Sequence, residues 1–405
     1  MTSRRRDAFM DDVVVNEVSR SEGEKLLIAS LAHRDFADLA LIKELYAKCN
    51  DRLLFELAKE HELEGIVGER LVAVGRAHGR WLEAIADWKY TMRCRLDELD
   101  ALAEALAAKG IELVALKNAG IARGIYPYLS ECPMGDIDLL VSKKDFVAAH
   151  EILLSLDYVP AFRVADTIEE LGLEAALLSG GAEYKKDLSD DILWLELQWR
   201  PIAGRWISPE VEAKAEDLLQ RAVAIEESDV KLLAPVDNLL QVCLHTAKHS
   251  YIRAPGLRLH SDVDRIVRFY DKAESSLDWG EFTERVEAMN LRVAVYFSLW
   301  IAHKLLGTPI PGNVLQRLKP SKWQEKAIWR ALLRGGFFHP QASKFTRLQY
   351  LRFTALLFDN PRACLRSAFP SQSYMMQHYE LGSKLQLPKT YAKRFFSLLF
   401  KRVRT

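Results

Sequence analysis

The sequence predicts an α/β (α+β) protein in which a small mixed-sheet domain is embedded between largely helical segments. Apolar residues recur every three or four positions over most of the chain, which is typical of amphipathic helices. Short strand-like apolar runs are concentrated between about residues 109 and 200. The length of 405 residues corresponds to two to three domains, and 49% hydrophobic with 28% charged residues is an ordinary globular composition.

The expected elements follow from these patterns in chain order. Helical periodicity extends from about residue 17 to 108 and ends at Lys109-Gly110. The next elements are a strand at 111–116, a helix at 118–125, a strand at 136–141, a helix at 143–156, a strand at 157–162, a helix at 167–178 and a hairpin of 182–186 with 191–199. Beyond Pro201 the helical pattern returns and continues almost to the end of the chain.

The chain therefore divides into four expected segments with different charge. They are an N-terminal helical segment (1–100), a mixed-sheet domain (101–200), a helical segment that completes it (201–316) and a C-terminal helical segment (317–405). The last segment has 18 Lys and Arg against three Asp and Glu, whereas residues 1–316 have 38 against 53. The formal net charge of zero thus combines a negative part and a positive part, each of 15 charges.

Several protein classes have no support in the sequence. No apolar run approaches the roughly 18–20 residues that a membrane-spanning helix needs. Asp7, not an apolar stretch, follows the N-terminal arginines, so a signal peptide is not expected. The five cysteines are far apart and form no C-x-x-C pair, which suits a reducing compartment. P-loop, Rossmann and hydrolase motifs are missing too, and we expect a cytoplasmic protein.

Two aspartates in the stretch 133–141 (PMGDIDLLV) carry the strongest chemical signal. Because side chains alternate along a strand, Asp136 and Asp138 project from the same face. Two adjacent carboxylates repel each other unless a cation lies between them, and Mg²⁺ prefers such oxygen ligands. Gly135 lets a ligand approach the backbone closely. The alternative is a loop-capping aspartate followed by a solvent-facing one.

Two further charged residues extend this pattern. Glu196 lies in the middle of a second expected strand, on the face that it shares with Trp194 and Gln198. It could complete a three-carboxylate metal site, or be an exposed residue of an edge strand. Lys117 follows the strand 111–116 at a helix start, where its ammonium and free N–H groups could hold a phosphate. The alternative for Lys117 is a solvated lysine.

Three segments, taken in this order, resemble the motifs of a known protein family. They are 116–120 (LKNAG), 133–141 (PMGDIDLLV) and 195–200 (LELQWR). They are similar to the bacterial uncharacterised nucleotidyltransferases of the DNA polymerase beta superfamily, over about residues 101–268. The resemblance implies a short mixed sheet flanked by helices. It also implies transfer of a nucleoside monophosphate from ATP or another nucleoside triphosphate to an acceptor, with Mg²⁺ or Mn²⁺ as cofactor.

The resemblance also implies roles for individual residues. Asp136 and Asp138 would bind the metal, and Glu196 would be the third metal-binding carboxylate or the base that activates the acceptor. Two-metal chemistry of this kind stabilises the attacking and leaving oxygens. Lys117, with its neighbour Asn118 and with Gly135, would contact the nucleotide.

Three positions depart from the family pattern. Asn118 stands where a glycine is expected, Cys132 where an arginine is expected, and Gln198 where a histidine is frequent. These departures leave a second hypothesis open, a non-catalytic nucleotide-binding or scaffold relative. A third hypothesis is a toxin-like enzyme that modifies protein side chains.

The resemblance also implies a helical segment at 238–267 that follows the sheet domain and carries a polar cluster. His245, Lys248, His249 and Asp262, together with Gln198, are candidates for lining an acceptor pocket. A zinc site and a purely structural network are the alternatives, although no third zinc ligand follows from the spacing. We expect a small molecule, glycan precursor or peptide as acceptor, because the catalytic part is acidic and contains no RNA-binding module.

The C-terminal stretch 389–404 alternates basic residues with phenylalanines and leucines. Such a segment can lie on an anionic membrane surface, which would make the protein peripheral to the membrane. It can also pack on its own domain, or bind nucleic acid or another anionic partner.

Overall fold

The computed structural model describes residues 11–161, 180–188, 191–201, 207, 211–253, 256–272, 276–339, 344–379 and 381–400. The expected helix at 167–178 lies outside these residues. The N-terminal helices are α1 (Asp12–Val18), α2 (Glu22–Leu31), α3 (Leu39–Ala47), α4 (Asp51–Glu60), α5 (Glu64–Ala73) and α6 (Arg80–Ala107). The first four begin where Asp11, Ser21, Asp38 and Asn50 accept hydrogen bonds from the free amides of the first turn.

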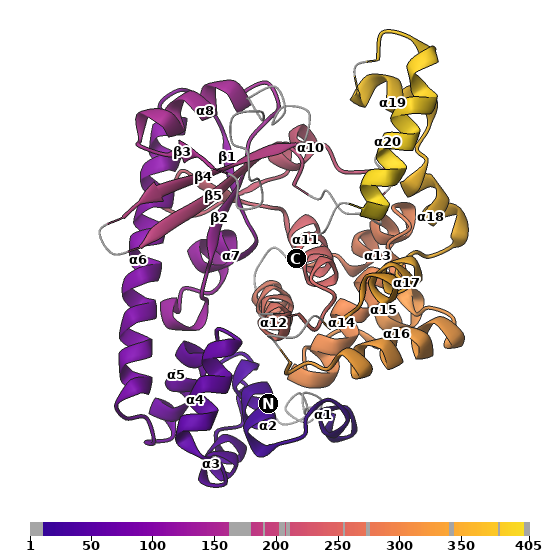
Figure 1. Ribbon diagram of the computed structural model, residues 1–405. Coiled ribbons are helices and arrows are strands. Elements are labelled where there is room, and N and C mark those ends of the chain that lie inside the picture. Colours follow the sequence, from indigo (N-terminus) through magenta and orange to yellow (C-terminus); the bar gives the residue numbers. More distant parts are fainter. Residues whose placement is uncertain are drawn as a thin grey trace.

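A mixed sheet of seven strands forms the second part. The strands are β1 (Leu113–Leu116), β2 (Asp136–Leu140), β3 (Val159–Pro160), β4 (Gly181–Asp187), β5 (Ile192–Gln198), β6 (Val223–Ala224) and β7 (Val230–Leu232), in the order β3-β4-β5-β2-β1-β7-β6. β2 pairs in parallel with β5 and antiparallel with β1, and β1 pairs in parallel with β7. The predicted fold class is confirmed, with the sheet flanked by the long helix α6 (Figure 1).

The sheet differs from the sequence prediction at its margins. The segment beyond Pro201 was expected to be helical, but β6 and β7 extend the sheet next to β1. Both strands are too short to show a period of two. The expected strand at 157–162 is only the two residues of β3. The expected helix at 118–125 is α7 (Lys117–Gly120), which continues as a π-helix (Ile121–Ile125).

Helices α8 (Phe146–Ser155) and α10 (Ala215–Gln220) accompany the sheet, and a second helical group follows it. This group consists of α11 (Pro235–Lys248), α12 (Gly256–Lys272), α13 (Trp279–Ala288), α14 (Arg292–Leu306), α15 (Gly312–Leu318) and α16 (Lys322–Gly335). α11 packs on α12 and α14 and also contacts α7, so it connects the sheet with the helical core. α12 is buried along nearly its whole length, including five of its charged residues.

The chain ends with α17 (Arg347–Leu356), α18 (Pro361–Ala368), α19 (Gln372–His378), the 3₁₀-helix Lys384–Gln386 and α20 (Leu387–Phe400). In Figure 1 this part, drawn in orange to yellow, lies on the side of the molecule opposite α6. Among the described residues, every helix is too short or too polar to cross a bilayer.

Candidate active site

The centre of the candidate site lies on the neighbouring strands β2 and β5. Asp138 and Glu196 stand directly opposite each other in the parallel pairing of these strands. Gln198, two residues further along β5, donates a hydrogen bond from Nε2 to Asp138 Oδ1 over 2.8 Å. Asp138 is 4% exposed, whereas the side chain of Glu196 is 38% exposed. The pair therefore combines a buried carboxylate with one that solvent or a ligand can reach.

Lys117 joins this pair from β1. Leu116, the last residue of β1, is paired with Asp138, and the next residue, Lys117, has a φ of 50°. This left-handed conformation costs a residue with a side chain about 1 kcal/mol. The Lys117 ammonium lies 2.5 Å from Asp138 Oδ1 and 4.0 Å from Glu196 Oε2. Three adjacent strands thus bring two carboxylates and one ammonium together, and a strained backbone is retained at their junction.

The charges in this cluster are strongly coupled. Burial raises the pKa of Asp138 to about 6, and Glu196 adds to the rise while Lys117 opposes it. Burial alone would lower the pKa of Lys117, but Asp138, Glu196 and Asp136 outweigh it and hold that pKa above its ordinary value. Lys117 therefore stays protonated in this environment.

Asp136 and Gly135 form the entrance of β2. Asp136 is partly exposed and acts electrostatically on Lys117, so it belongs to the same charged group. Gly135 is exposed, and a Cβ atom added to it would meet no atom within 4 Å. Open space in front of this backbone is what close approach of a ligand requires.

The loop before β2 is held by polar side chains from other elements. Arg265 donates to the carbonyl oxygen of Glu131, Arg258 to that of Pro133, and Arg95 to that of Met134. Asn118 Nδ2 donates to Pro133 as well, over 3.2 Å. All four of these side chains are buried. We call the three guanidinium groups of Arg95, Arg258 and Arg265 the arginine clamp, and they fix the segment that leads into Asp136.

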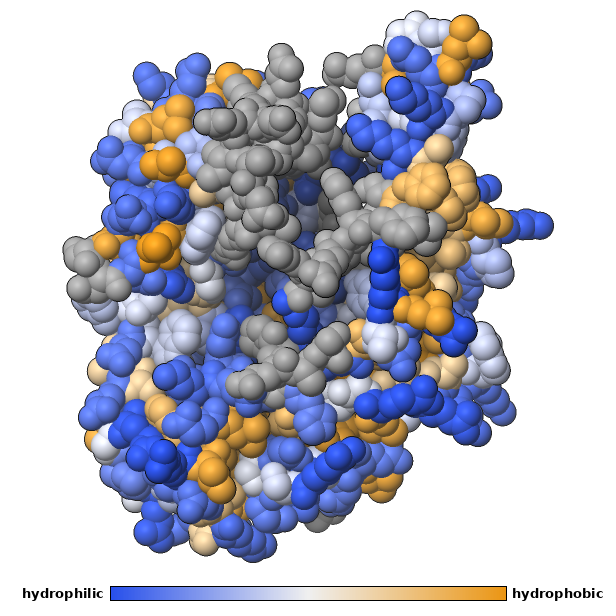
Figure 2. Space-filling model, in the orientation of Figure 1, coloured by the Kyte–Doolittle hydropathy of each residue, from blue (hydrophilic) through white to orange (hydrophobic). Residues whose placement is uncertain are grey.

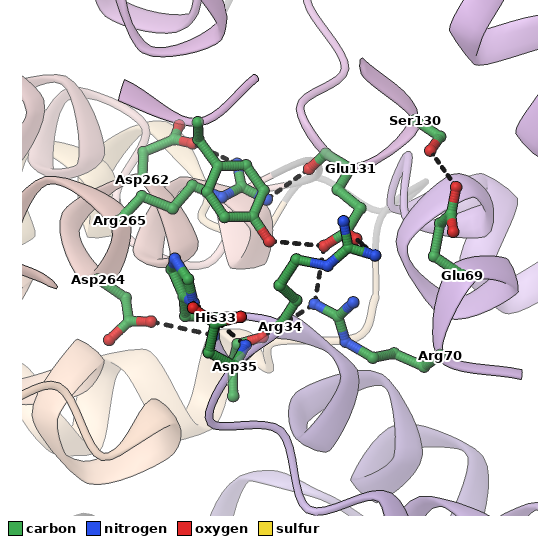
Figure 3. Close-up of polar contacts among 12 residues, drawn as sticks. His33, Arg34, Asp35, Glu69, Arg70, Ser130, Glu131, Asp262, Asp264 and Arg265 are labelled. Atoms are coloured by element: carbon green, nitrogen blue, oxygen red, sulfur yellow. Dashed lines mark hydrogen bonds and ion pairs between the residues drawn. The ribbon is translucent and has the colours of Figure 1, made fainter. Parts of the chain in front are cut away.

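Figure 3 shows a buried polar network around Glu131 and Arg265. The carboxylate of Glu131 accepts hydrogen bonds from Arg70 over 2.8 Å and from Tyr126 over 2.6 Å, and Arg34 lies 3.4 Å away. The Arg265 guanidinium lies 4.4 Å above the ring of Tyr126. The network connects α5 and the segment after α2 with the loop and with α12.

Asp262 lies in this network. It is 1% exposed, and its Oδ1 atom accepts a hydrogen bond from Arg265 Nη1 over 3.1 Å. It was expected among the residues of an acceptor pocket because it lies in the helical segment that the family resemblance implies. The structure places its carboxylate against the arginine clamp.

The end of α11 brings three other expected residues toward the carboxylates. Burial lowers the pKa of His245 well below its ordinary value, and the charges of His249 and Lys117 contribute. Lys248 is exposed, yet the protein surrounds it closely enough that desolvation lowers its pKa, whereas Glu196 and Asp138 act to raise it. The rings of His245 and His249 lie edge to face, 4.7 Å apart. This side of the site is therefore cationic or neutral, opposite the acidic sheet.

The arginine clamp and the side-chain amide of Gln241 were not predicted from the sequence. Gln241 accepts a hydrogen bond from the backbone N–H of Lys117 over 3.4 Å. Arg258 and Arg265 looked like ordinary charged residues of a helix, and Arg95 lies in a long helix with many charges. α12 has a charged face and an apolar face, and its sequence alone fits a solvated amphipathic helix. Only its burial shows that the charged face forms buried ion pairs.

The carboxylates fit a divalent cation by their chemistry. Asp136, Asp138 and Glu196 offer the hard oxygen ligands that Mg²⁺ and Mn²⁺ prefer. In the observed arrangement, however, the Lys117 ammonium holds the cation position between Asp138 and Glu196. Within the described part of the chain, no three His, Cys, Asp or Glu side chains lie so that they could hold a metal ion. Metal binding at these carboxylates therefore requires Lys117 to move away from Asp138.

Comparison with known proteins gives one match. A family model described as uncharacterised nucleotidyltransferase matches residues 48–307, which is more than half of the chain. The matched part begins just after α3 and ends just after α14, so it includes the whole sheet and the arginine clamp. No curated protein and no solved structure matches.

Proposed function

The chain belongs to the uncharacterised nucleotidyltransferase family, and from this membership we propose a specific reaction. The protein transfers a nucleoside monophosphate from a nucleoside triphosphate to a hydroxyl or similar group on a small molecule, glycan precursor or peptide. The acceptor oxygen attacks the α-phosphorus, the bond between the α- and β-phosphates breaks, and pyrophosphate leaves.

One observation carries this proposal. Asp138 on β2 and Glu196 on β5 lie 2.5 Å and 4.0 Å from the ammonium of Lys117, the residue that follows β1. Phosphoryl-group chemistry needs such a concentration of charge, because the transferred phosphorus carries several charged oxygens. Mg²⁺ or Mn²⁺, held by Asp136, Asp138 and Glu196, supplies positive charge to the phosphate oxygens when it is bound.

The protein's own side chains have separate tasks in this proposal. Lys117 leaves Asp138 and contacts a phosphate, while Gln198 keeps Asp138 oriented through its 2.8 Å hydrogen bond. Glu196, the more exposed carboxylate, accepts the proton of the acceptor hydroxyl. His245, Lys248 and His249 face the carboxylates from α11 and line the side on which the acceptor enters. Gly135 leaves room for the nucleotide beside the backbone.

The test is pyrophosphate release with each nucleoside triphosphate and a panel of acceptors. We expect the wild-type protein to release pyrophosphate and Asp136→Asn and Asp138→Asn to lose at least 100-fold in rate, as roughly expected when transition-state charge stabilisation is removed. Asp271→Asn, an exposed aspartate of α12, is the matched control and should behave like the wild type. Equal rates in all four proteins would exclude these aspartates from the reaction.

A second candidate function is nucleotide binding without catalysis. It is favoured by the position of Lys117, because Lys117 and Gln198 both already engage Asp138 Oδ1. Calorimetric titration separates the two functions: a scaffold binds a nucleoside triphosphate but releases no pyrophosphate with any acceptor.

A further inference from the structure

The C-terminal end of the chain carries a strong local excess of positive charge. Residues 361–405 contain nine Lys and Arg and a single acidic residue, Glu380. In the described part of this segment every charged side chain is basic. The candidate active site needs none of these residues.

The way α20 is attached determines which of its sides is exposed. The Tyr391 hydroxyl donates to the carbonyl oxygen of Pro370 over 2.5 Å, and Arg394 Nη2 donates to that of Ser367 over 2.9 Å. Tyr391 and Arg394 are three residues apart and therefore lie on the same side of the helix, toward α18. α19 contacts α20 as well, and the part of α20 that neither helix covers is open to solvent.

That outer side combines charge with apolar surface. Lys389, Lys393 and Phe396 are spaced by four and three residues, so they share one stripe of α20, and all three are exposed. Phe396 is 58% exposed. At the edge between the helices, Phe395 stacks on Phe369 at 5.5 Å.

α18, which contacts α20, carries exposed side chains of the same two kinds. Arg362, Leu365 and Arg366 follow the same helical spacing and are exposed, with Leu365 at 61%. We call Arg362, Leu365, Arg366, Lys389, Lys393 and Phe396 the basic apolar face. In Figure 2 orange and blue residues alternate over these C-terminal helices.

We propose that the basic apolar face docks on the surface of an anionic phospholipid bilayer. Lysine and arginine are attracted by the charge of the lipid headgroups, and exposed leucine and phenylalanine side chains enter the boundary between headgroups and acyl chains. A nucleic acid would use the basic residues but gain little from the exposed aliphatic Leu365. The combination of both kinds of side chain on one face therefore favours a bilayer.

Docking would also orient the candidate active site. Tyr374 of α19 interacts through its side chain with Arg200, two residues beyond Gln198 at the end of β5. The C-terminal helices are thus connected to the strand that carries Glu196. A docked protein would hold β5 at a fixed place relative to the membrane, where an acceptor at the membrane surface can reach it.

The proposal is tested by co-sedimentation of the full chain with vesicles, without nucleotide. We expect binding to mixed phosphatidylcholine and phosphatidylglycerol vesicles, weaker binding at high salt, and no binding to pure phosphatidylcholine. Lys389→Glu with Lys393→Glu should weaken binding roughly tenfold or more, because each basic residue near an anionic surface contributes about a fivefold factor. Phe396→Ser should weaken it at high salt too, where screening leaves mainly the apolar contribution.

The control is Lys322→Glu with Trp323→Ser on α16, an exposed basic and aromatic pair outside the face. It should bind like the wild type, and circular dichroism shows whether each variant is folded. Three results would overturn the proposal: equal binding to neutral vesicles, vesicle binding that the α20 variants leave unchanged, or binding of the wild type to RNA or DNA but not to vesicles. Because no nucleotide is present, none of these results depends on whether the proposed transfer reaction occurs.

Discussion

Asp138 is the carboxylate of the candidate site that the surrounding sheet holds most closely. Its carboxylate is buried, paired with Lys117 and fixed by Gln198. Removing one partner of a buried ion pair leaves an uncompensated charge, which is strongly destabilising. Substitutions here therefore need a folding control, and Glu196, whose side chain is 38% exposed, is a better position for separating catalysis from stability.

Gly135 allows a test of ligand approach that does not disturb the fold. A Cβ atom at this position meets open space, so Gly135→Ala should change the free energy of unfolding by no more than about 0.5 kcal/mol. If a nucleotide lies against this backbone, the added methyl group should weaken nucleotide binding several-fold. Calorimetric titration and urea unfolding measure the two effects.

Gly120→Ala serves as a comparison for the stability of Gly135→Ala. A Cβ atom at Gly120 would lie 2.6 Å from the carbonyl oxygen of Ala115, so this variant should lose stability because the backbone must shift. If Gly135→Ala binds nucleotide as tightly as the wild type, the nucleotide does not lie at the entrance of β2.

At this scale the sequence allowed part of the candidate site to be predicted. Strand alternation places Asp136 and Asp138 on one face, and the structure adds that Glu196 stands opposite Asp138. The direct contact of Lys117 with Asp138 was not predictable, because it depends on a left-handed residue at the end of β1. The pairing of Asp262 with Arg265 was not predicted either, because the sequence of a helix does not show which of its charged residues are buried.

At the scale of elements, the arginine clamp is the main device that positions β2. The loop that it holds has backbone carbonyls that strand pairing does not satisfy, and buried carbonyls need donors. Arg258 supplies one donor to Pro133 and lies 3.1 Å from Glu62 with another nitrogen. The clamp thus ties α12 and the N-terminal helices to the entrance of the site.

Arg258→Met should loosen this loop. A hydrogen bond from a charged group contributes about 1.5–3 kcal/mol, so we expect a loss of stability in this range and faster hydrogen exchange at the amides of Gly135 and Asp136. Arg258→Lys should recover part of the protection, because an ammonium can still donate to a carbonyl. Arg330→Met, an exposed residue of α16, should have no effect on these amides. Unchanged exchange in Arg258→Met would show that the loop is held by other contacts.

Long helices and strands were predicted correctly from the sequence, whereas the shortest strands were not. β4 and β5 have seven residues each and were recognised as a hairpin, and the long helix α6 was evident from its period. β6 and β7 have two and three residues and pair with each other within ten residues of chain, whereas the pairing of β7 with β1 is a contact distant in sequence. Local patterns cannot contain such information, whereas a run of seven alternating residues does.

At the scale of the whole molecule, the first and last thirds of the chain are in contact. His61, which ends α4, lies with its ring 5.5 Å from Phe338, beyond α16. Its side chain is fully buried, and burial together with the charge of Lys344 lowers its pKa to about 4 from 6.5. The N-terminal helices are therefore attached to the C-terminal part through a neutral histidine.

This histidine predicts acid sensitivity. A lowered pKa means that the unfolded chain binds a proton more tightly, so the stabilisation is complete above about pH 6.5 and is lost as the pH falls toward about 4. At pH 5 the loss amounts to about 2 kcal/mol, since each pKa unit corresponds to about 1.4 kcal/mol. Urea unfolding at pH 7 and pH 5 measures the difference.

His61→Leu should reduce the difference between the two pH values by about this amount, because comparing the same variant at both pH values cancels its packing cost. His339→Leu, an exposed histidine, serves as the control and should leave the difference unchanged. An equal pH dependence of His61→Leu and the wild type would assign the acid sensitivity to other groups.

The strand order has a consequence for how such proteins diverge. Asp138 lies on β2, between β1 and β5. The hydrogen-bond ladders between these strands, and not flexible loops, therefore set the distances from Asp138 to Lys117 and to Glu196. The residues on α11 and the C-terminal helices belong to a separate layer, which can change without shifting these ladders. Evolution can therefore alter recognition by substitution in the helices while the charged centre keeps its dimensions, and an engineer can follow the same division.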